Sequence, residues 1–298
     1  EGSTSVQDLI RGQVVWKNDL LDDFVLIKSD GFPTYHLAVV TDDHLMDISH
    51  VMRAEEWLPS TPRHLMIYDA LGWRPPSFAH LPMILGSDRS KLSKRHGATS
   101  ALSYREQGYL PDAMFNFLAL LGWSFDDKTE LFSREELVST FSLERVAKAG
   151  AVFDQEKLSW MNGVYLRKLS ADALITNLQP FLERPFRAGG LPDSIPRALD
   201  RTCLISIAPL IQERIKVLSQ GTDLVSLFLE ENPSYPSKIL LQKGMDIPNT
   251  CQVLVSTKNI LEGVRDWNPS ELEQAIRPLL EELGVNTGQL FGSIRAAV

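Results

Sequence analysis

The chain has 298 residues, a formal net charge of −8, and ordinary globular proportions of hydrophobic (44%) and charged (23%) residues. This length allows two or three domains with sizeable cores. Only two cysteines occur, which excludes a disulfide framework and a four-thiolate zinc site and favours a reducing cytoplasm. No apolar run approaches the roughly 18–20 residues that span a bilayer, so no membrane partner is expected.

The first hundred residues alternate between strand and helix patterns. Apolar runs bounded by turn residues predict strands over 14–16, 24–27 and 81–85, and a further strand-like run follows Pro33. A helix is expected over 62–71, because proline suits a first helical turn and glycine a helix end. Strand, helix, strand and then a glycine-containing loop is the order typical of a doubly wound α/β domain.

From about residue 103 the pattern is helical. The run 111–121 is apolar on all sides and predicts a buried helix, and Ser133 with Glu136 forms a capping-box pattern. Asp154 is placed to cap the helix that follows it. Beyond residue 168 only helices are expected, over about 170–182, 195–218 and 268–284. The sequence therefore predicts an α/β part followed by an all-α part.

A basic loop follows the strand predicted over 81–85. Lys91, Lys94 and Arg95 fall within five residues, and their positive charges suit a polyphosphate whose negative charge grows during nucleotidyl transfer. On composition alone, a solvated basic loop is the alternative. The net charge of −8 argues against a nucleic-acid partner, but the region around this loop is nearly balanced in charge. A local RNA-binding patch is therefore permitted.

Four side chains upstream of the loop have chemistry that suits ligand binding. Arg53 can hold a carboxylate through two parallel hydrogen bonds, and Tyr35 offers a phenolic donor. Trp57 offers a flat apolar wall, and Glu56 an acceptor for an amino group or a ribose hydroxyl. The alternatives are a surface ion-pair cluster around Arg53 and ordinary core packing of the two aromatic residues.

Histidine and aspartate recur at short spacing between these residues, which raises the possibility of a metal site. The residues are Asp43, His44, Asp47 and His50. No further cluster of ligands supports such a site, and motifs this short often match by chance. A metal site is therefore disfavoured.

Three motifs in this order resemble those of class I aminoacyl-tRNA synthetases: PTYHLA at 33–38, RAEEW at 53–57 and KLSKRHG at 91–97. The third is similar to the signature loop of bacterial-type glutamyl-tRNA synthetases. The resemblance covers essentially the whole chain. It implies a cytoplasmic ligase that attaches L-glutamate to the 3′ end of its tRNA through a glutamyl-adenylate. ATP would be consumed, Mg²⁺ would arrive with ATP, and a monomer is expected.

The same resemblance implies roles for individual residues. Tyr35, Arg53 and Trp57 would bind the amino acid, and Lys94, supported by Lys91, would stabilise the transition state in which pyrophosphate leaves. The residues implied in ATP binding are Glu56, Ile84, Lys91, Leu92, Ser93, Lys94 and Arg95.

Arg214 occupies about the position of a family arginine that discriminates the last anticodon base. Unstacked bases are commonly read by stacking and by hydrogen bonds, for which arginine is well suited. The alternative for Arg214 is an ordinary solvated helix face.

The resemblance also implies a multidomain fold, α/β plus all-α. Residues 1–102 would be the C-terminal part of a class I Rossmann-like catalytic domain, with the end of its acceptor-binding insertion. Residues 103–168 would form a helical stem-contact domain, and residues 169–298 an all-α anticodon-binding domain truncated at its C-terminus. The family's first signature, a His-Ile-Gly-His-like motif, does not occur here. The chain is thus expected to be a fragment that lacks the N-terminal half of the catalytic domain.

Two classes of function remain open. One is the synthetase reaction of the parent enzyme, and the other is a non-catalytic tRNA-binding module, because half of the active site would be missing from this fragment. A glutaminyl-tRNA synthetase is disfavoured, since its relatives carry β-barrels where 170–298 here predicts helices. A tRNA-modifying paralogue is disfavoured by the same segment. Whether the parent also charges the glutamine tRNA is left open.

Overall fold

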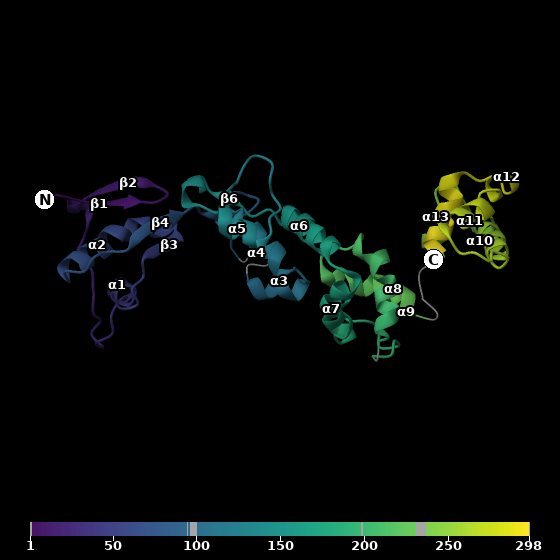
Figure 1. Cartoon of the computed structure of the whole chain (residues 1–298), viewed down its shortest axis with the longest axis horizontal. Helices are drawn as coiled ribbons and strands as arrows, with labels where there is room; N and C mark the ends of the chain where they lie inside the picture. Colours follow the sequence, from purple (N-terminus) through teal and green to yellow (C-terminus); the bar gives the residue numbers. More distant parts are fainter. Residues whose placement is uncertain (1, 94, 96–99, 198, 231–236, 298) are drawn as a thin grey trace. The chain divides into compact units, whose positions relative to one another are not determined.

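The structure is a computed structural model that describes residues 2–93, 95, 100–197, 199–230 and 237–297. The chain divides into two compact units, Glu1–Leu229 and Glu230–Val298, each with its own hydrophobic core (Figure 1). Within the described ranges, none of the helices combines the length and the apolar character that crossing a bilayer requires.

The first unit begins with an antiparallel hairpin of β1 (Ser3–Asp8) and β2 (Gly12–Lys17). The strand predicted over 14–16 is confirmed, since these residues lie within β2. The strand predicted over 24–27 is wrong, because only Ile27 forms an isolated bridge, to Pro33. Backbone hydrogen bonds inside this tight loop, including Thr34 N–H to the Leu26 carbonyl at 2.8 Å, take the place of a sheet ladder.

The strand-like run after Pro33 is in fact helix α1 (Tyr35–Leu45). Its β-branched residues favour a strand, but one of them, Val40, is 1% exposed and packs with Ile67 and Tyr68 of the next helix. This packing between α1 and α2 outweighs the local preference.

A parallel β-α-β unit follows and contains β3 (His50–Ala54), α2 (Thr61–Ala70) and β4 (Ser77–Leu81) (Figure 1). The helix predicted over 62–71 is confirmed, with its proline in the first turn. The strand predicted over 81–85 is divided, because β4 ends at Leu81 and the short β5 (Ile84–Leu85) begins after Pro82 and Met83. Proline cannot donate to a strand ladder, which accounts for the interruption.

The following segment is mainly helical, with α3 (Ala101–Gln107), α4 (Pro111–Ala119), α5 (Arg134–Thr140) and α6 (Gln155–Lys168). The short strand β6 (Ala151–Val152) pairs in parallel with β5. The capping box of Ser133 and Glu136 and the cap at Asp154 are confirmed. The helix predicted over 111–121 ends at Ala119 and is not buried on all sides, since Phe115 and Leu118 are 37% and 49% exposed.

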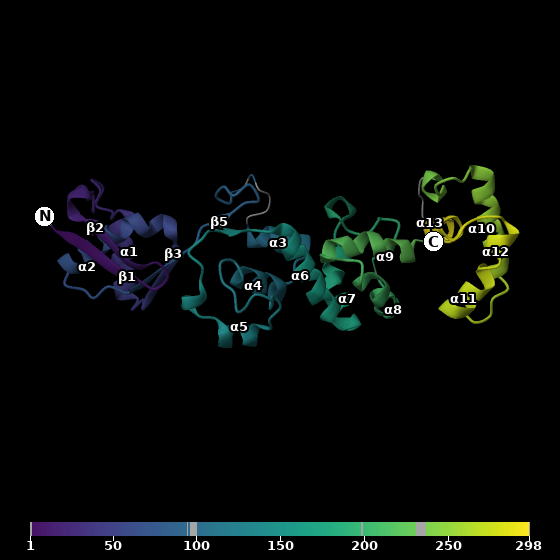
Figure 2. The ribbon, with the colours of Figure 1, turned by 90° about the horizontal axis from the view of Figure 1, so that it is seen from above.

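The first unit ends with α7 (Ala171–Leu182), α8 (Arg201–Gln212) and α9 (Gly221–Leu229), which contact one another (Figure 2). A single helix over 195–218 is wrong. After α8 the chain leaves helical geometry, and Ile215 and Leu218 enter the same core as Ile211. Burial of these side chains, and the hydrogen bond from Leu218 N–H to the Gly108 carbonyl at 3.1 Å, hold this non-helical path.

The second unit contains α10 (Ile247–Leu261), α11 (Pro269–Ile276), α12 (Leu279–Glu282) and α13 (Thr287–Ala297). The helix predicted over 268–284 is two helices, because Pro278, which has no backbone N–H to donate, stands between α11 and α12. Short 3₁₀ helices complete the described parts of both units: η1 (Asn18–Leu20), η2 (Glu55–Ser60), η4 (Leu143–Arg145), η5 (Phe186–Ala188), η6 (Leu218–Gln220) and η7 (Ser237–Leu240).

Candidate active site

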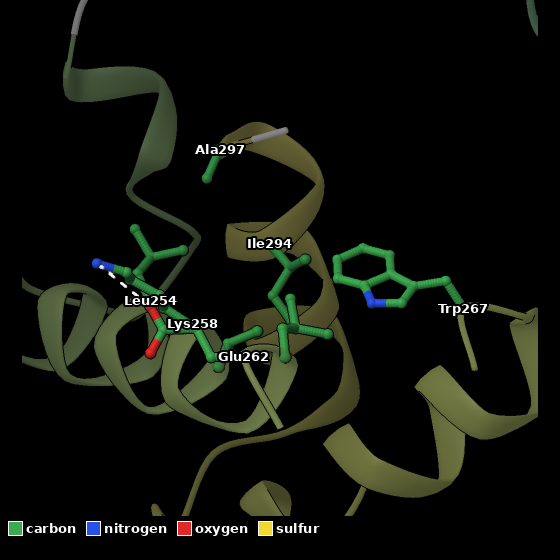
Figure 3. Close-up of a pocket in the computed structure, with 8 residues that line it drawn as sticks. Leu254, Lys258, Glu262, Trp267, Ile294 and Ala297 are labelled. Carbon is green, nitrogen blue, oxygen red and sulfur yellow. Dashed lines mark ion pairs between the residues drawn. The ribbon is translucent and has the colours of Figure 1, made fainter. Parts of the chain in front are cut away.

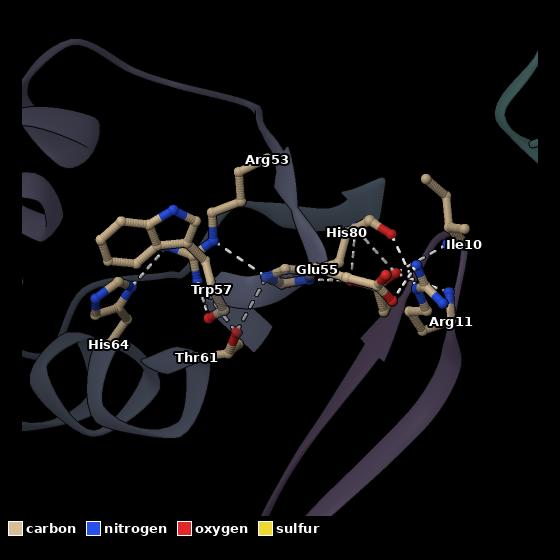
Figure 4. Close-up of polar contacts among 9 residues, drawn as sticks. Ile10, Arg11, Arg53, Glu55, Trp57, Thr61, His64 and His80 are labelled. Carbon is tan, nitrogen blue, oxygen red and sulfur yellow. Dashed lines mark hydrogen bonds and ion pairs between the residues drawn. The ribbon is translucent and has the colours of Figure 1, made fainter. Parts of the chain in front are cut away.

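Arg53 is the central residue of the site. It lies near the carboxyl end of β3, directly opposite His80 of β4 in the strand register. Its Nε–H donates to His80 Nε2 at 3.1 Å, and Nη1 lies 3.2 Å from His64 Nδ1 (Figure 4). Its Nη2 donates to Thr61 Oγ1 at 3.1 Å and to the Trp57 carbonyl at 3.4 Å. Because a guanidinium only donates, the imidazole nitrogens that face it are unprotonated.

These partners of Arg53 carry no formal negative charge, and within the described parts of the chain Arg53 forms no ion pair. Burial lowers the pKa of the Arg53 guanidinium, and the Tyr35 phenol opposes this shift. The group nevertheless keeps its proton, as arginine does in proteins generally. The site therefore presents a half-buried cation held by neutral acceptors.

A buried carboxylate supports one of these acceptors. His80 Nδ1 lies 2.6 Å from Asp8 Oδ2, and both side chains are fully buried. Asp8 Oδ1 also accepts the backbone N–H groups of Ile10 at 3.0 Å and Arg11 at 2.8 Å, which close the β1–β2 turn. Burial acts to raise the pKa of Asp8, but the hydrogen bonds it accepts from Arg11, His80 and Ile10 outweigh burial and leave that pKa lowered.

A second histidine supports Arg53 from the side of α2. Burial, and then the positive charge of Arg53, lowers the pKa of His64 to about 3, so its imidazole is neutral at neutral pH. His64 Nε2 lies 2.9 Å from Nδ1 of His36 on α1. Because His64 Nδ1 accepts from Arg53, its proton resides on Nε2 and is donated to His36.

Two aromatic side chains form a wall beside the guanidinium. The rings of Tyr35 and Trp57 have centroids 4.9 Å apart at an interplanar angle of 42°. Tyr35 is 48% exposed and Trp57 is 36% exposed, so these rings are not packed in the core. The structure therefore brings together the three side chains expected to bind an amino acid.

The two glutamates next to Arg53 have other ion-pair partners. Glu55 pairs with Arg11 at 2.7 Å and accepts the Met83 N–H at 3.1 Å. Glu56 pairs with Lys91 of the basic loop. The ion-pair cluster around Arg53 that the sequence allowed is thus not formed among the described residues.

The basic loop starts beside β5. Ile84 is 38% exposed, and its carbonyl accepts the Leu92 N–H at 2.9 Å. Arg95 donates to Ser90 Oγ at 2.7 Å, and Ser93 is exposed. Lys94 lies outside the described residues. A cavity of about 600 Å³ adjoins the loop and is lined by Gly86, Ser87, Leu92, Arg95, Tyr104, Val152, Phe153, Asp154, Gln155 and Glu156.

Arg214 lies in the helical part of the first unit. It is exposed and sits in the turn that follows α8, where its N–H donates to the Ile211 carbonyl at 2.9 Å. The alternative expected for Arg214, a place on a solvated helix face, is therefore wrong, because α8 ends two residues before it.

The histidine and aspartate run around residue 47 lines a separate cavity of about 500 Å³ at the amino ends of β3 and β4. His44 stacks on Trp73 with ring centroids 4.0 Å apart, and His50 Nδ1 lies 3.0 Å from Ser49 Oγ. In the part of the chain that the structure describes, no group of three or more histidine, cysteine, aspartate or glutamate side chains could hold a metal ion.

The second unit contains an apolar pocket of about 420 Å³ between α10 and α13 (Figure 3). Trp267 forms one wall and is 67% exposed, and Lys258 pairs with Glu262 at 3.7 Å at the rim. The remaining lining residues are Leu254, Thr257, Leu261, Ile294 and Ala297.

The chain matches two known domain families. Residues 1–160, more than half of the chain, match the catalytic domain of the class I tRNA synthetases (E and Q), the enzymes for glutamate and glutamine. The chain belongs to this class I synthetase family. Residues 173–298 match an anticodon binding domain. The class I synthetase fold expected from the sequence, with its helical anticodon-binding part, is thereby confirmed.

Named relatives are consistent with this assignment. The glutamate–tRNA ligase of Dehalococcoides mccartyi strain CBDB1 is 52% identical over 297 residues, and that of Roseiflexus castenholzii is 46% identical over 300 residues. Both alignments cover 100% of this chain, which spans about 60% of the length of the curated relatives it matches. A crystal structure of the glutamate tRNA ligase of Elizabethkingia meningosepticum, in complex with its amino acid, is similar at a TM-score of 0.78. It is 33% identical, and the match covers 99% of this chain and 60% of that one.

Sequence reasoning missed the buried partners of Arg53. His64, His80, Thr61 and Asp8 were not expected at the site, although each is within one hydrogen bond of Arg53 or of its partner. The sequence offered no signal for these contacts, because β3 and the part of β4 that carries His80 were not among the predicted strands.

Proposed function

We propose that the protein, in its full natural length, attaches L-glutamate to the 3′ end of its tRNA through a glutamyl-adenylate formed from ATP. The observation that carries this proposal is the Arg53 guanidinium, held by neutral acceptors beside the exposed rings of Tyr35 and Trp57. A half-buried cation without a carboxylate partner among the described residues suits a ligand that brings its own carboxylate. The names of the relatives support glutamate as that ligand.

Arg53 has donor capacity left for a carboxylate. A guanidinium has five N–H groups, and four contacts to His80, His64, Thr61 and the Trp57 carbonyl are used here, of which the one to the Trp57 carbonyl is the longest at 3.4 Å. The Tyr35 phenol is a further hydrogen-bond partner of the group. The Nη1–H that does not face His64 and this weakly engaged Nη2–H lie on the two terminal nitrogens. We assign them to the two oxygens of a substrate carboxylate, with Tyr35 and Trp57 covering its side.

The basic loop is assigned to ATP. Lys91 pairs with Glu56, and a nucleotide would exchange this contact for its phosphates and its ribose. Lys94 is assigned to the negative charge that develops as pyrophosphate leaves, with the loop residues Leu92, Ser93 and Arg95 and the strand residue Ile84 alongside the nucleotide. Mg²⁺ is assigned to the phosphates of ATP rather than to a protein cage, as is usual for this ion.

The remaining parts are assigned to tRNA. We propose residues 1–102 as the catalytic part, 103–168 as a stem-contact domain and 169–298 as the anticodon-binding domain, with Arg214 reading the anticodon. The match of 173–298 to an anticodon binding domain supports the last assignment. We further infer a cytoplasmic monomer. The two free cysteines, Cys203 and Cys251, are consistent with a reducing compartment.

ATP–pyrophosphate exchange tests this function. In the presence of L-glutamate, the full natural protein is expected to exchange labelled pyrophosphate into ATP only when its tRNA is present. It is also expected to transfer labelled glutamate to that tRNA. Charging of glutamate and glutamine tRNAs side by side defines the range of tRNA substrates. Binding of tRNA without exchange would instead support the alternative, a non-catalytic tRNA-binding module.

A further inference from the structure

We propose that His80, held in one tautomer by Asp8, is the positioning residue that fixes the Arg53 guanidinium in the orientation that receives the substrate carboxylate. The inference rests on the proposed function, because it assigns a role to a neighbour of the proposed carboxylate-binding group. His80 does not contact the substrate in this scheme and acts only through Arg53.

The strand register gives the first step of the argument. Arg53 and His80 are directly paired across the parallel strands β3 and β4, so their side chains leave the sheet on the same face. The Nε–H and one Nη2–H of Arg53 share one edge of the guanidinium, and they meet His80 Nε2 at 3.1 Å and Thr61 Oγ1 at 3.1 Å. Thr61 Oγ1 lies 3.3 Å from the same His80 nitrogen. This closed triangle fixes the plane of the guanidinium, and with it the direction of the N–H groups that are assigned to the ligand.

The direction of the hydrogen bonds gives the second step. Arg53 can only donate, so His80 Nε2 has to accept, and the imidazole proton has to be on Nδ1. A buried Nδ1–H needs an acceptor, and Asp8 Oδ2 supplies it at 2.6 Å. The other Asp8 oxygen is held by the backbone N–H groups of Ile10 and Arg11, so the carboxylate cannot rotate away. The ionised Asp8 therefore selects the only His80 tautomer that can hold Arg53.

A structural brace is the competing explanation. His80 and Asp8 also join β4 to the β1–β2 hairpin, and this contact alone could explain their burial. The two explanations differ in which half of the imidazole matters. Positioning needs the acceptor at Nε2, which faces Arg53, whereas a brace needs only the donor at Nδ1, which faces Asp8.

Two amide substitutions separate these halves. The amide nitrogen of asparagine lies near the Nδ1 position, so His80→Asn keeps a donor for Asp8 and removes the acceptor for Arg53. Glutamine reaches the Nε2 position, so His80→Gln keeps an acceptor for Arg53 and removes the donor to Asp8. We compare four forms of the full natural protein by tRNA-dependent ATP–pyrophosphate exchange: the wild type, His80→Asn, His80→Gln and Arg53→Lys.

We expect His80→Asn to raise the KM for glutamate by about ten- to a hundredfold and to leave the KM for ATP within about twofold, since displacing a binding group by about 1 Å can cost two orders of magnitude. His80→Gln is expected to restore most of the glutamate affinity. The opposite order, with His80→Gln more impaired than His80→Asn, would overturn the inference in favour of a brace. If His80→Asn raised the KM for ATP as much as the KM for glutamate, the inference would be overturned as well.

The outcomes also distinguish this inference from the proposed function. If the wild type shows no glutamate-dependent exchange, both the proposed function and the inference are contradicted. If the wild type is active and Arg53→Lys impairs exchange, but His80→Asn does not, only the inference is contradicted.

Nitrogen NMR of the wild type gives a readout that needs no activity and no variant. The His80 ring is expected to be neutral, with a protonated Nδ1 and an unprotonated Nε2. A ring protonated on Nε2, or on both nitrogens, would contradict the inference.

Discussion

The Lys91 ammonium group pairs with the Glu56 carboxylate and thereby joins the basic loop to the segment that follows β3. Both side chains are exposed, 60% for Lys91 and 41% for Glu56. An exposed pair contributes only about 0–1 kcal/mol, so an incoming nucleotide can replace it at little cost. The neighbouring Glu55 differs, since its partner Arg11 is only 14% exposed and the same carboxylate also accepts the Met83 N–H.

Substituting the two glutamates is therefore expected to have unequal effects on stability. Glu56→Gln should leave the free energy of unfolding within about 1 kcal/mol of the wild type. Glu55→Gln should lower it by at least about 1 kcal/mol, because the more buried Arg11 loses its counter-charge. Urea unfolding of both variants measures the difference. Equal losses would show that the two pairs do not differ in the way their burial indicates.

Arg53→Lys is expected to raise the KM for glutamate sharply and to leave the KM for ATP nearly unchanged. A lysine cannot reproduce the planar fork that meets His80, Thr61 and a carboxylate at once. The measurement is exchange kinetics at varied glutamate and varied ATP. Arg63→Lys on α2, where the guanidinium lies over the Phe24 ring at 5.7 Å, is the matched control and should leave both constants unchanged.

Lys94→Ala is expected to lower the turnover of ATP–pyrophosphate exchange by a hundred- to a thousandfold. A charge preorganised toward a developing anion is typically worth roughly 2.7–4 kcal/mol of transition-state stabilisation. The KM for ATP should change less, because the ground state gains less from this charge. Lys128→Ala, at an exposed turn, is the control. Full activity of the Lys94→Ala protein would show that Lys94 does not stabilise the transition state of adenylate formation.

Arg214→Gln is expected to weaken discrimination between the glutamate and glutamine tRNAs. The exposed turn after α8 leaves this guanidinium accessible to an unstacked base. The ratio of kcat/KM for the two tRNAs is the measurement, with the exposed Arg187→Gln as control. An unchanged ratio would remove Arg214 from the anticodon site.

Acid is expected to destabilise the first unit through His36, His64 and His80. Burial is the largest cause that lowers each of their pKa values, and for His64 the value falls from 6.5 to about 3. Below pH 6.5 the unfolded chain binds protons that the folded chain does not, so stability falls as pH falls, for His64 down to about pH 3. Each such group contributes at most about 1.4 kcal/mol per pH unit.

Urea unfolding between pH 7.5 and pH 5 measures this loss. His64→Asn should flatten the dependence on pH, whatever its effect at neutral pH. If the free energy of unfolding of the variant changed with pH as steeply as that of the wild type, His64 would not bind a proton on unfolding.

Local sequence signals predicted structure well where a capping residue or a proline marks a boundary. The capping box at Ser133 and the proline at the start of α2 are examples. The same reasoning failed for α1, because the strand preference of its β-branched residues was outweighed by burial of Val40 against α2. Propensity describes a residue alone, and packing depends on what the fold places beside it.

The site divides in a similar way. The ordered motifs predicted Arg53, Tyr35 and Trp57 as one ligand pocket, and the structure brings these three together. The partners of Arg53 could not be predicted, because their contacts depend on the register of β3 against β4 and on docking of a hairpin from the start of the chain. Neither relationship leaves a periodic pattern in the sequence.

The contact between Asp8 and His80 spans 72 positions of the chain. Contacts that close such long loops generally form late in folding, after the local helices and turns. The first eight residues and the β-α-β unit must therefore both be in place before Arg53 acquires its final surroundings. A nascent or partly unfolded chain would thus contain Arg53 without its hydrogen-bond partners. The full affinity of Arg53 for a carboxylate would be reached only in the last stages of folding.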